Sequence, residues 1–409
     1  MSLISVAEAI ERLLSGVAPL GPETVPIAAG HGRVLAETLA ARLTQPPFAA
    51  SAMDGYAVRA ADATAGARLV VVGMSRAGER FHGRLGPGEA ARIFTGAPVP
   101  EGADAVLIQE NAARDGEGIV VAEPVSAGQF VRRVGLDFAA GDHLLAGGRL
   151  LDPHALALAA SMGYGAIPVR RRPKVAVLSN GDELVPPGET PGEDQIVSSN
   201  GIGLAALVRE CGGDPTDLGI APDRREAIAA SVDRAEGADI LVVAGGASVG
   251  EHDLVQAALA ERGMALDFWK IAMRPGKPLM VGRIGAMHVL GLPGNPVSAL
   301  VCGHVFLKPL IRAKLGLPAE ADMSVARLGA PMAENNGRQD FVRARLTGDR
   351  HRRAVTPFAA QDSSMLATLA AADALIVRPV RAPAAVAGDE VPILMLRSSP
   401  DTSFSFIGN

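Results

Sequence analysis

An alternation of strand-like and helix-like segments over residues 173–318 constrains the fold of this chain most strongly. The apolar runs are KVAVL, TDLGI, DILVVAGG, LDFWK and MHVLGL, and the segments between them have helical character over residues 199–212, 224–235 and 252–262 and after Pro296. Strands that alternate with helices are typical of a parallel sheet covered by helices on its faces. The sequence therefore predicts a parallel, Rossmann-like α/β domain over residues 173–318.

Four glycine-, proline- or acid-rich loops follow the predicted strands: SNGDEL, GGASVGEHD, RPGKP and GLPGNP. Ligands of such sheets bind beyond the carboxyl ends of the strands, so we expect the four loops to share one rim. The second loop matches neither a Walker loop nor the dinucleotide-binding pattern. Its backbone could bind a phosphorylated ligand, or it could be only a tight strand-to-helix turn. The candidate binding residues in it are Gly245, Gly246, Ser248 and Gly250.

Charged side chains of both signs accompany these loops. Glu183 lies beside Asp182, and Asp253 follows Glu251, while Asp223 comes after another strand. Clustered carboxylates suit Mg²⁺ that bridges phosphate oxygens, although Asp223 could instead cap the next helix. The segment WKIAMRPGKP adds cations able to neutralise an oxyanion, namely Lys270, Arg274 and Lys277.

The rest of the chain divides into three further predicted domains. Residues 41–135 form a β-rich domain, because short runs such as RLVVVG, AVLIQE and GIVVAE are separated by turns. Residues 319–409 form a C-terminal β-barrel with strands FVRARL, ALIVRPV and VPILML. Residues 1–40 and 136–172 form a discontinuous helical connector. Its helices begin with a Ser5–Glu8 capping box and with Asp152 followed by Pro153.

Two loops of the predicted β-rich domain carry further candidates. SAMDGYAV places Asp54 in a tight turn, where an aspartate often bonds only its own backbone. TGAPVPEGAD begins with Thr95 and is stiffened by proline and glycine, which is equally compatible with a binding loop and with scaffold. Both residues therefore stay open between a functional and a structural role at this point.

Composition excludes several classes of function. A net charge of −5 and 3% aromatic residues argue against nucleic acid as a partner, and no apolar run approaches the roughly 18 residues of a membrane helix. No export signal is evident, and Cys211 and Cys302 are too few for a disulfide scaffold, so we expect a cytoplasmic protein. No Ser-His-Asp or Cys-His pattern with family-type spacing occurs, which disfavours covalent catalysis.

Taken in order, the motifs resemble those of the molybdopterin molybdenumtransferase family (MoeA, and the corresponding part of gephyrin). The matching blocks are SAMDGYAV, TGAPVPEGAD, VRRVGLDF, GDEL, GGASVGEHD, FWKIAMRPGKP, GLPGNPVSA and GRQDFVR. They extend over nearly the whole chain. The resemblance implies four domains, with an α/β molybdopterin-binding domain, and an elongated homodimer.

The resemblance also implies an activity: a transferase of molybdenum cofactor biosynthesis that inserts molybdate into adenylylated molybdopterin with Mg²⁺-dependent release of AMP. Asp54 and Thr95 of one subunit would then reach the α/β domain of the other. The implied catalytic residues are Asp54, Thr95, Glu183, Asp223 and Asp253, and all of these except Thr95 would be Mg²⁺ ligands. Asp137 matches a further acidic position. The implied molybdate- and phosphate-binding residues are Lys270, Arg274, Arg343 and Ser363, and Pro293 and Pro296 would keep a neighbouring loop rigid.

Three blocks depart from the commoner wording of the family. The usual GED block reads Gly135-Leu136-Asp137, a lysine is replaced by Arg274, and Ser179-Asn180 stand where threonines are frequent. Two other functions remain as alternatives: adenylylation of molybdopterin with ATP, and a gephyrin-like scaffold. The expected transient partners are a molybdopterin-adenylylating protein and molybdoenzymes or cofactor carriers.

Overall fold

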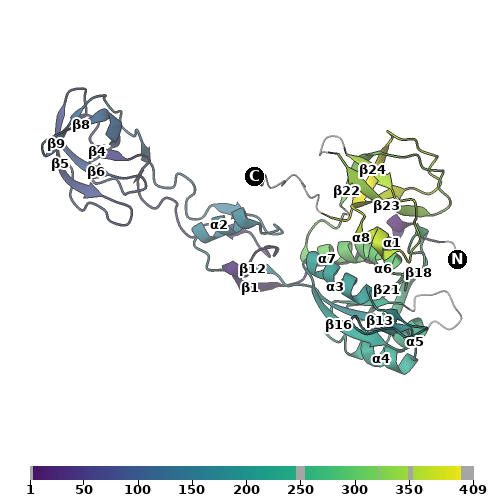
Figure 1. Ribbon diagram of the computed structural model, residues 1–409. Helices are drawn as coiled ribbons and strands as arrows, with labels where there is room; N and C mark the ends of the chain where they lie inside the picture. The colour runs from purple at the N-terminus through teal and green to yellow at the C-terminus, as the bar shows by residue number, and fades with distance from the viewer. Residues whose placement is uncertain (1–2, 246–253, 321, 349–352, 398–409) are drawn as a thin grey trace. The chain divides into compact units, whose positions relative to one another are not determined.

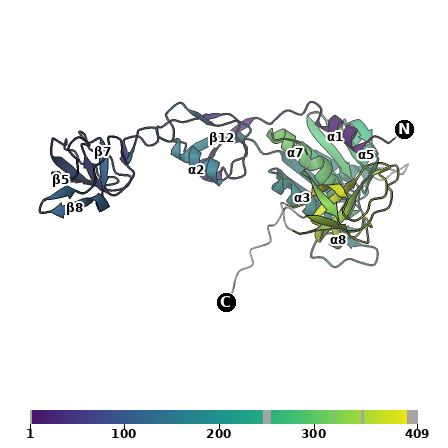
Figure 2. The same ribbon diagram turned by 90° about the horizontal axis from the view of Figure 1, so that it is seen from above.

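The computed structural model describes residues 3–245, 254–320, 322–348 and 353–397. They form two compact units, one of Thr24–Val169 and one of Met1–Glu23 with Arg170–Asn409. Figures 1 and 2 show both units, and each is described by itself below. No helix in the described ranges is long and apolar enough to cross a membrane.

The larger unit contains the predicted α/β domain, built on a six-stranded sheet in the order β16-β13-β17-β21-β20-β18. The first four strands are parallel. The three inner strands β13, β17 and β21 are mostly apolar and buried, as expected of strands covered on both faces, whereas β16 at the edge is more polar and exposed. Their bounds are β13 Lys174–Asn180, β16 Asp214–Ala221, β17 Ile240–Ala244 and β21 Met287–Leu292.

Of the remaining two strands, β20 (Met280–Ile284) runs antiparallel to both of its neighbours, so β18 (Ala265–Trp269) at the edge has the same direction as the first four strands. The α/β class is thus confirmed, and the LDFWK strand has the direction of the parallel series as expected, but β20 was not predicted and separates this strand from β21. Only Gly285 and Ala286 connect β20 to β21. So short a connection can form only a hairpin, because a parallel pair needs a crossover of a dozen or more residues. Gly285 adopts φ +56°, which suits such a turn.

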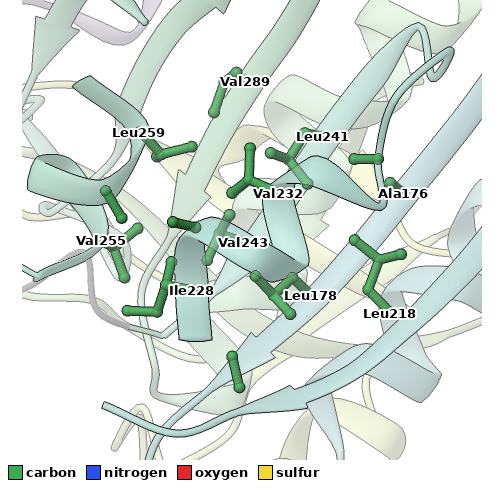
Figure 3. Packing of buried hydrophobic residues seen from close by; sticks show 14 of the residues in the cluster. Ala176, Leu178, Leu218, Ile228, Val232, Leu241, Val243, Val255, Leu259 and Val289 are labelled. Atoms are coloured by element: carbon green, nitrogen blue, oxygen red, sulfur yellow. The ribbon is translucent and has the colours of Figure 1, made fainter. Parts of the chain in front are cut away.

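Helices cover both faces of the sheet, as Figure 1 shows. On one face α4 (Arg225–Asp233) packs beside α5 (Leu254–Glu261), and their apolar side chains meet those of the strands (Figure 3). The other face carries α3 (Asn200–Glu210), α6 (Pro296–Cys302) and α7 (Lys308–Leu315), and the π-helical turn Gly303–Leu307 joins the last two. The helices α3, α4 and α6 begin within two residues of their predicted starts, whereas the start predicted for α5 at residue 252 lies outside the described residues.

The N-terminal helix α1 (Val6–Leu14) begins as predicted, with Ser5 Oγ accepting a hydrogen bond from the Glu8 amide at 3.1 Å. Its buried side chains are Val6, Ala9 and Leu13, and the helix packs on α7. It therefore belongs to the larger unit, whereas α2 (Pro153–Ser161) belongs to the other. The expectation that both helices form one connector is corrected, because the apolar face of α1 is buried on the α/β domain.

The C-terminal part of the larger unit is a closed five-stranded barrel, which confirms the predicted barrel. The ring closes because β23 pairs with both β24 and β25. The short strand β19 (Met273–Arg274) of the RPGKP region pairs with β23 on the outside. The barrel elements are β22 Met323–Leu328, β23 Gln339–Thr347, β24 Ala354–Pro357, α8 Leu366–Ala370, β25 Ala374–Arg378 and β26 Glu390–Met395.

The unit of residues 24–169 is β-rich, with α2 packed on a separate apolar cluster. Asp152 Oδ1 accepts the Ala155 amide at 2.7 Å and Pro153 is the first helical residue, as predicted. The main sheet has the order β7-β4-β6-β5-β9-β8. Its strands are β4 Gly55–Val58, β5 Arg68–Ser75, β6 Glu89–Ile93, β7 Ala105–Ile108, β8 Ala112–Asp115 and β9 Gly118–Val121.

Four two-stranded pairs contain the remaining strands of the described residues, which also include two short 3-10 helices at Ile27–Ala29 and Gln109–Asn111. The pairs are β1 (Pro22–Pro26) with β12 (Ala166–Arg170), β2 (Leu39–Ala40) with β11 (His143–Leu145), β3 (Ala50–Ser51) with β10 (Val131–Arg132), and β14 (Leu184–Val185) with β15 (Ile196–Val197). The exact limits of the four predicted domains stay predictions.

Candidate functional site

A cavity of about 680 Å³ lies at the carboxyl ends of β13, β17 and β21. Three of the four predicted loops contribute to its wall, and so does Gly245 of the fourth. The lining residues include Ser179, Asn180, Glu183, Ser199, Asn200, Gly245, Pro278, Pro293, Gly294, Asn295, Pro296 and Ser364. The predicted shared rim is thus confirmed for the described residues, whereas Gly246, Ser248, Gly250 and Asp253 lie outside them.

Gly245 ends β17 where the backbone of β13 passes close by. Its φ is +107°, and a Cβ atom built there would lie 2.3 Å from the carbonyl oxygen of Asn180. Its own amide donates to Leu292 O at 3.1 Å, which ties the ends of β17 and β21 together. Only glycine fits this position without displacing the backbone of a neighbouring strand.

Proline fixes the wall opposite. Pro293 and Pro296 both line the cavity, and Pro296 is the first residue of α6. Asn295 Nδ2 donates to Ser363 Oγ at 2.9 Å, and the Val297 amide donates to the Ser363 carbonyl at 3.1 Å. The predicted residue Ser363 therefore holds the start of α6 from the barrel side, and its neighbour Ser364 lines the cavity.

The predicted acidic residues are only partly brought together. Glu183 is exposed and lines this cavity, while Asp182 lines a second one of about 440 Å³ on the β16 side. Asp182 Oδ1 accepts the Asp223 amide at 2.9 Å. Asp223 does not cap α4, whose N-cap is Arg224 without a side-chain cap bond. Among the described residues no three His, Cys, Asp or Glu side chains gather as a metal site.

The predicted cations lie on the segment between β18 and β20. Arg274, about half exposed, forms an ion pair with the buried carboxylate of Asp340 in the barrel. Lys270 has φ +72° and its Nζ lies 4.4 Å from the centroid of the Trp269 ring, while Lys277 is exposed. Arg274 thus already has a carboxylate partner, and the two lysines carry the charge that faces solvent.

Arg343 does not have the setting of an anion ligand. Its exposed fraction is 1%, and burial lowers the pKa of its guanidinium. Its Nε donates to Gln361 Oε1 and its terminal nitrogen donates to Met365 O, both at 3.2 Å. Arg343 therefore supports the loop that carries Ser363 and Ser364, and the expectation that it contacts molybdate is not favoured by its burial.

In the other unit, Asp54 and Thr95 form a defined pair. The Thr95 amide and hydroxyl donate to Asp54 Oδ1 at 2.7 and 2.8 Å. These bonds, the amide first, lower the pKa of Asp54 from its ordinary value of 3.8. The carboxylate bonds a residue far along the chain, and its location in a tight turn had suggested a bond to its own backbone. The arrangement presents a partly exposed carboxylate that is ionised more readily than an ordinary aspartate.

Asp137 lies in the same unit, in the wall of a cavity of about 350 Å³ that Gln45, Arg132 and Gly96 also line. Its amide donates to Gln45 O at 3.0 Å. Gly96 directly follows Thr95, so Asp137 and the Asp54–Thr95 pair belong to one region of this unit.

Sequence reasoning missed three residues of the larger cavity: Asn180, Asn200 and Ser364. Ser199 and Asn200 were noted only as the start of a helix, and Asn180 only as a departure from the family wording. The signal available for Asn180 and Asn200 was their location after a predicted strand or at the start of a predicted helix, whereas Ser364 lies in a loop of the barrel between β24 and α8 and has no such signal in the sequence.

Three family models match successive parts of the chain. They are the MoeA N-terminal region (domain I and II) over residues 4–163, a probable molybdopterin binding domain over residues 176–313, and the MoeA C-terminal region (domain IV) over residues 325–396.

Known proteins resemble the chain over most of its length. Molybdopterin molybdenumtransferase 2 of Mycobacterium tuberculosis is 37% identical over 385 residues, covering 91% of this chain and 94% of that protein. The molybdopterin molybdenumtransferase of Haemophilus influenzae is 40% identical over 299 residues, 73% of this chain and 74% of that protein. A MoeA protein of Pyrococcus horikoshii has a TM-score of 0.86 at 33% identity, covering 97% of this chain and all of that structure.

Proposed function

The chain belongs to the molybdopterin molybdenumtransferase (MoeA) family, and from this premise we propose that it inserts molybdate into adenylylated molybdopterin and releases AMP during molybdenum cofactor biosynthesis. The observation that carries the proposal is the cavity at the carboxyl ends of β13, β17 and β21. Sheets of this kind bind ligands there. Its volume of about 680 Å³ is in the range of about 300–1,000 Å³ that small-molecule sites occupy.

The phosphate-linked part of the substrate binds at the glycine-rich loop that begins at Gly245, directly after β17. Backbone amides of such a loop at the end of a parallel strand favour a phosphate group. Gly245 contributes backbone at the same edge, and we assign Gly246, Ser248 and Gly250, outside the described residues, to the same group.

Mg²⁺ fits the residues present. At phosphate sites this ion is held by one or two carboxylates together with phosphate oxygens, so a three-carboxylate cage is not required. Glu183 is the carboxylate in the wall of this cavity. Glu183 would hold the ion, with Asp253, Asp223 and Asp54 as further candidates. When bound, Mg²⁺ neutralises charge on the phosphoanhydride.

The residues of the chain position the reacting groups. Lys270 and Lys277 supply positive charge for the molybdate oxyanion, whereas Arg274 is held by Asp340. The Ser363–Asn295 bond fixes the wall at the start of α6. Such fixed groups contribute by positioning and charge compensation, and the chemistry requires no protein nucleophile.

The active form is a homodimer in this proposal. Asp54 and Thr95 of one subunit act with the cavity of the other, as the family resemblance implies. The protein works in the cytoplasm, receives substrate from a molybdopterin-adenylylating protein and passes the cofactor to molybdoenzymes or carriers. Its cysteines, Cys211 and Cys302, are free thiols, which suits a reducing compartment.

The test is AMP release from adenylylated molybdopterin by the purified protein with molybdate and Mg²⁺. We expect AMP release that depends on molybdate, and loss of at least tenfold in Glu183→Gln. Glu189→Gln, an exposed acid outside the cavity wall, serves as the matched control and should retain the wild-type rate. Consumption of ATP with no AMP release from the adenylylated substrate would replace the proposal by the preceding adenylylation step.

A further inference from the structure

Two side-chain oxygens in the cavity wall lack hydrogen-bond partners among the described residues. They are Asn180 Oδ1 and Asn200 Oδ1, and both atoms are buried. Both residues line the same cavity of about 680 Å³. Asn180 has an exposed fraction of 4%. A buried hydrogen-bond acceptor without a donor lowers the stability of the folded protein, so two such acceptors in one cavity wall indicate a ligand that donates hydrogen bonds to them.

The orientation of both amides is fixed by their other ends. Asn180 Nδ2 donates to Ala221 O at 3.0 Å, and Asn200 Nδ2 donates to Gly294 O at 2.7 Å. A backbone carbonyl only accepts, so the NH₂ group of each amide must face it. The oxygen atoms are therefore the groups that each side chain keeps for another partner.

The neighbouring hydroxyls do not fill this need. Ser198 Oγ donates to Ser179 Oγ at 3.3 Å, and no hydroxyl of the described residues donates to Asn180 Oδ1 or Asn200 Oδ1. The wall thus combines two neutral acceptors with the negative charge of Glu183. Such a wall favours the hydrogen-bond donor edge of a neutral heterocycle.

We propose that Asn180 and Asn200 are specificity-determining residues that accept hydrogen bonds from the 2-amino and N3–H groups of the pterin ring. The inference rests on the proposed function and adds the part of the substrate that this wall recognises. A 2-amino-4-oxopyrimidine edge carries two adjacent donors, which matches two acceptors. The edge of adenine instead places its amino group between acceptor nitrogens, so the adenylate end of the substrate does not match.

The experiment measures the affinity of the whole protein for 6-hydroxymethylpterin and for its 2-dimethylamino and 3-methyl analogues, each of which lacks one donor. Wild type should bind each analogue about threefold to tenfold more weakly, the effect of one hydrogen bond. Asn200→Ala should bind the parent pterin more weakly by about the same factor. It should bind one of the two analogues no more weakly than wild type does, because that analogue already lacks the donor that Asn200 accepts from. Asn111→Ala, which removes an amide of the other unit that bonds Glu123, is the matched control and should keep the wild-type ratios.

Three results would overturn the inference. The first is that wild type binds all three pterins with equal affinity or binds none of them, and the second is that Asn200→Ala loses the same factor in affinity for all three pterins. The third is that Asn200→Ala loses affinity for AMP but not for the pterin. Guanosine 5′-monophosphate carries the same donor pair and is titrated separately. If guanosine 5′-monophosphate binds more tightly than the pterin, and Asn200→Ala weakens the binding of both ligands by the same factor, the cavity wall recognises guanine and the pterin assignment is wrong. Pterin discrimination without AMP release would reject the proposed function alone, since the comparison of analogues uses no turnover.

Discussion

Replacement of Arg343 by methionine separates a supporting role of this residue from contact with molybdate. The side chains at 342, 344 and 346 belong to the apolar cluster of the barrel, so Arg343 and Arg345 lie on the other face of β23. There Arg343 is covered by the loop that includes Gln361 and Met365. Arg343→Met removes both side-chain bonds and leaves Met365 O without this donor.

The structure sets the size of the effect. Hydrogen bonds from a charged group contribute about 1.5–3 kcal/mol each, but these two are long, at 3.2 Å, and a buried guanidinium carries a desolvation cost that methionine removes. We expect a net destabilisation of the barrel by about 2 kcal/mol, equivalent to about 30-fold faster exchange through opening. The KM for molybdate should change little.

Native-state hydrogen exchange of β23 and β25 measures this effect within one part of a multidomain chain. Arg345→Met is the matched control, because Arg345 is exposed and lies 5.5 Å from the Phe358 ring centroid; it should cost no more than about 1 kcal/mol. Unchanged exchange in Arg343→Met together with a large rise in the KM for molybdate would refute the supporting role.

Three further predictions follow from single residues. Gly245→Ala should abolish most AMP release and lower stability by about 1–3 kcal/mol, because the new Cβ would meet Asn180 O at 2.3 Å; wild-type activity and unfolding would contradict this. Thr95→Val should raise the pKa of Asp54 toward 3.8 without reaching it, because the hydrogen bond from the Thr95 amide remains. Thr95→Ser keeps a hydroxyl donor and should keep the low pKa. An NMR titration that shows the same Asp54 pKa in both variants would contradict a role of the Thr95 hydroxyl in lowering it. Burial lowers the pKa of His288 to about 4 from the ordinary 6.5, so the unfolded chain binds the proton at higher pH than the folded chain does. The free energy of unfolding should therefore fall by about 3 kcal/mol as pH decreases from 6.5 to 4. Urea unfolding of His288→Leu should show a smaller decrease over this window, and a decrease equal to that of wild type would contradict the role of His288.

Much of the site could be predicted because apolar runs end abruptly in glycine, proline or acids. KVAVL, DILVVAGG and MHVLGL are each β-branched and bounded in this way, and their carboxyl ends do meet at one cavity. The same reasoning could not give the place of the LDFWK strand in the sheet. That place depends on the hairpin at Gly285 and Ala286, which introduces β20 between this strand and β21.

Side-chain roles were harder to predict than backbone positions. An arginine on a strand reads as a candidate cation, yet Arg343 is buried by a loop from residues well beyond it in the chain. Asn200 reads as a helix start, and only the contact of its amide with Gly294 O identifies its oxygen as a free acceptor in the cavity. Both outcomes depend on contacts between distant segments, which local patterns do not encode.

The most direct test of the central claim is hydrogen exchange of the full chain with and without adenylylated molybdopterin, in the absence of molybdate. The account predicts slower exchange in three segments, residues 179–184, 244–245 and 293–297, and a smaller effect with ATP. Protection confined to other parts of the chain, or none at saturating ligand, would contradict the assignment of this cavity as the substrate site.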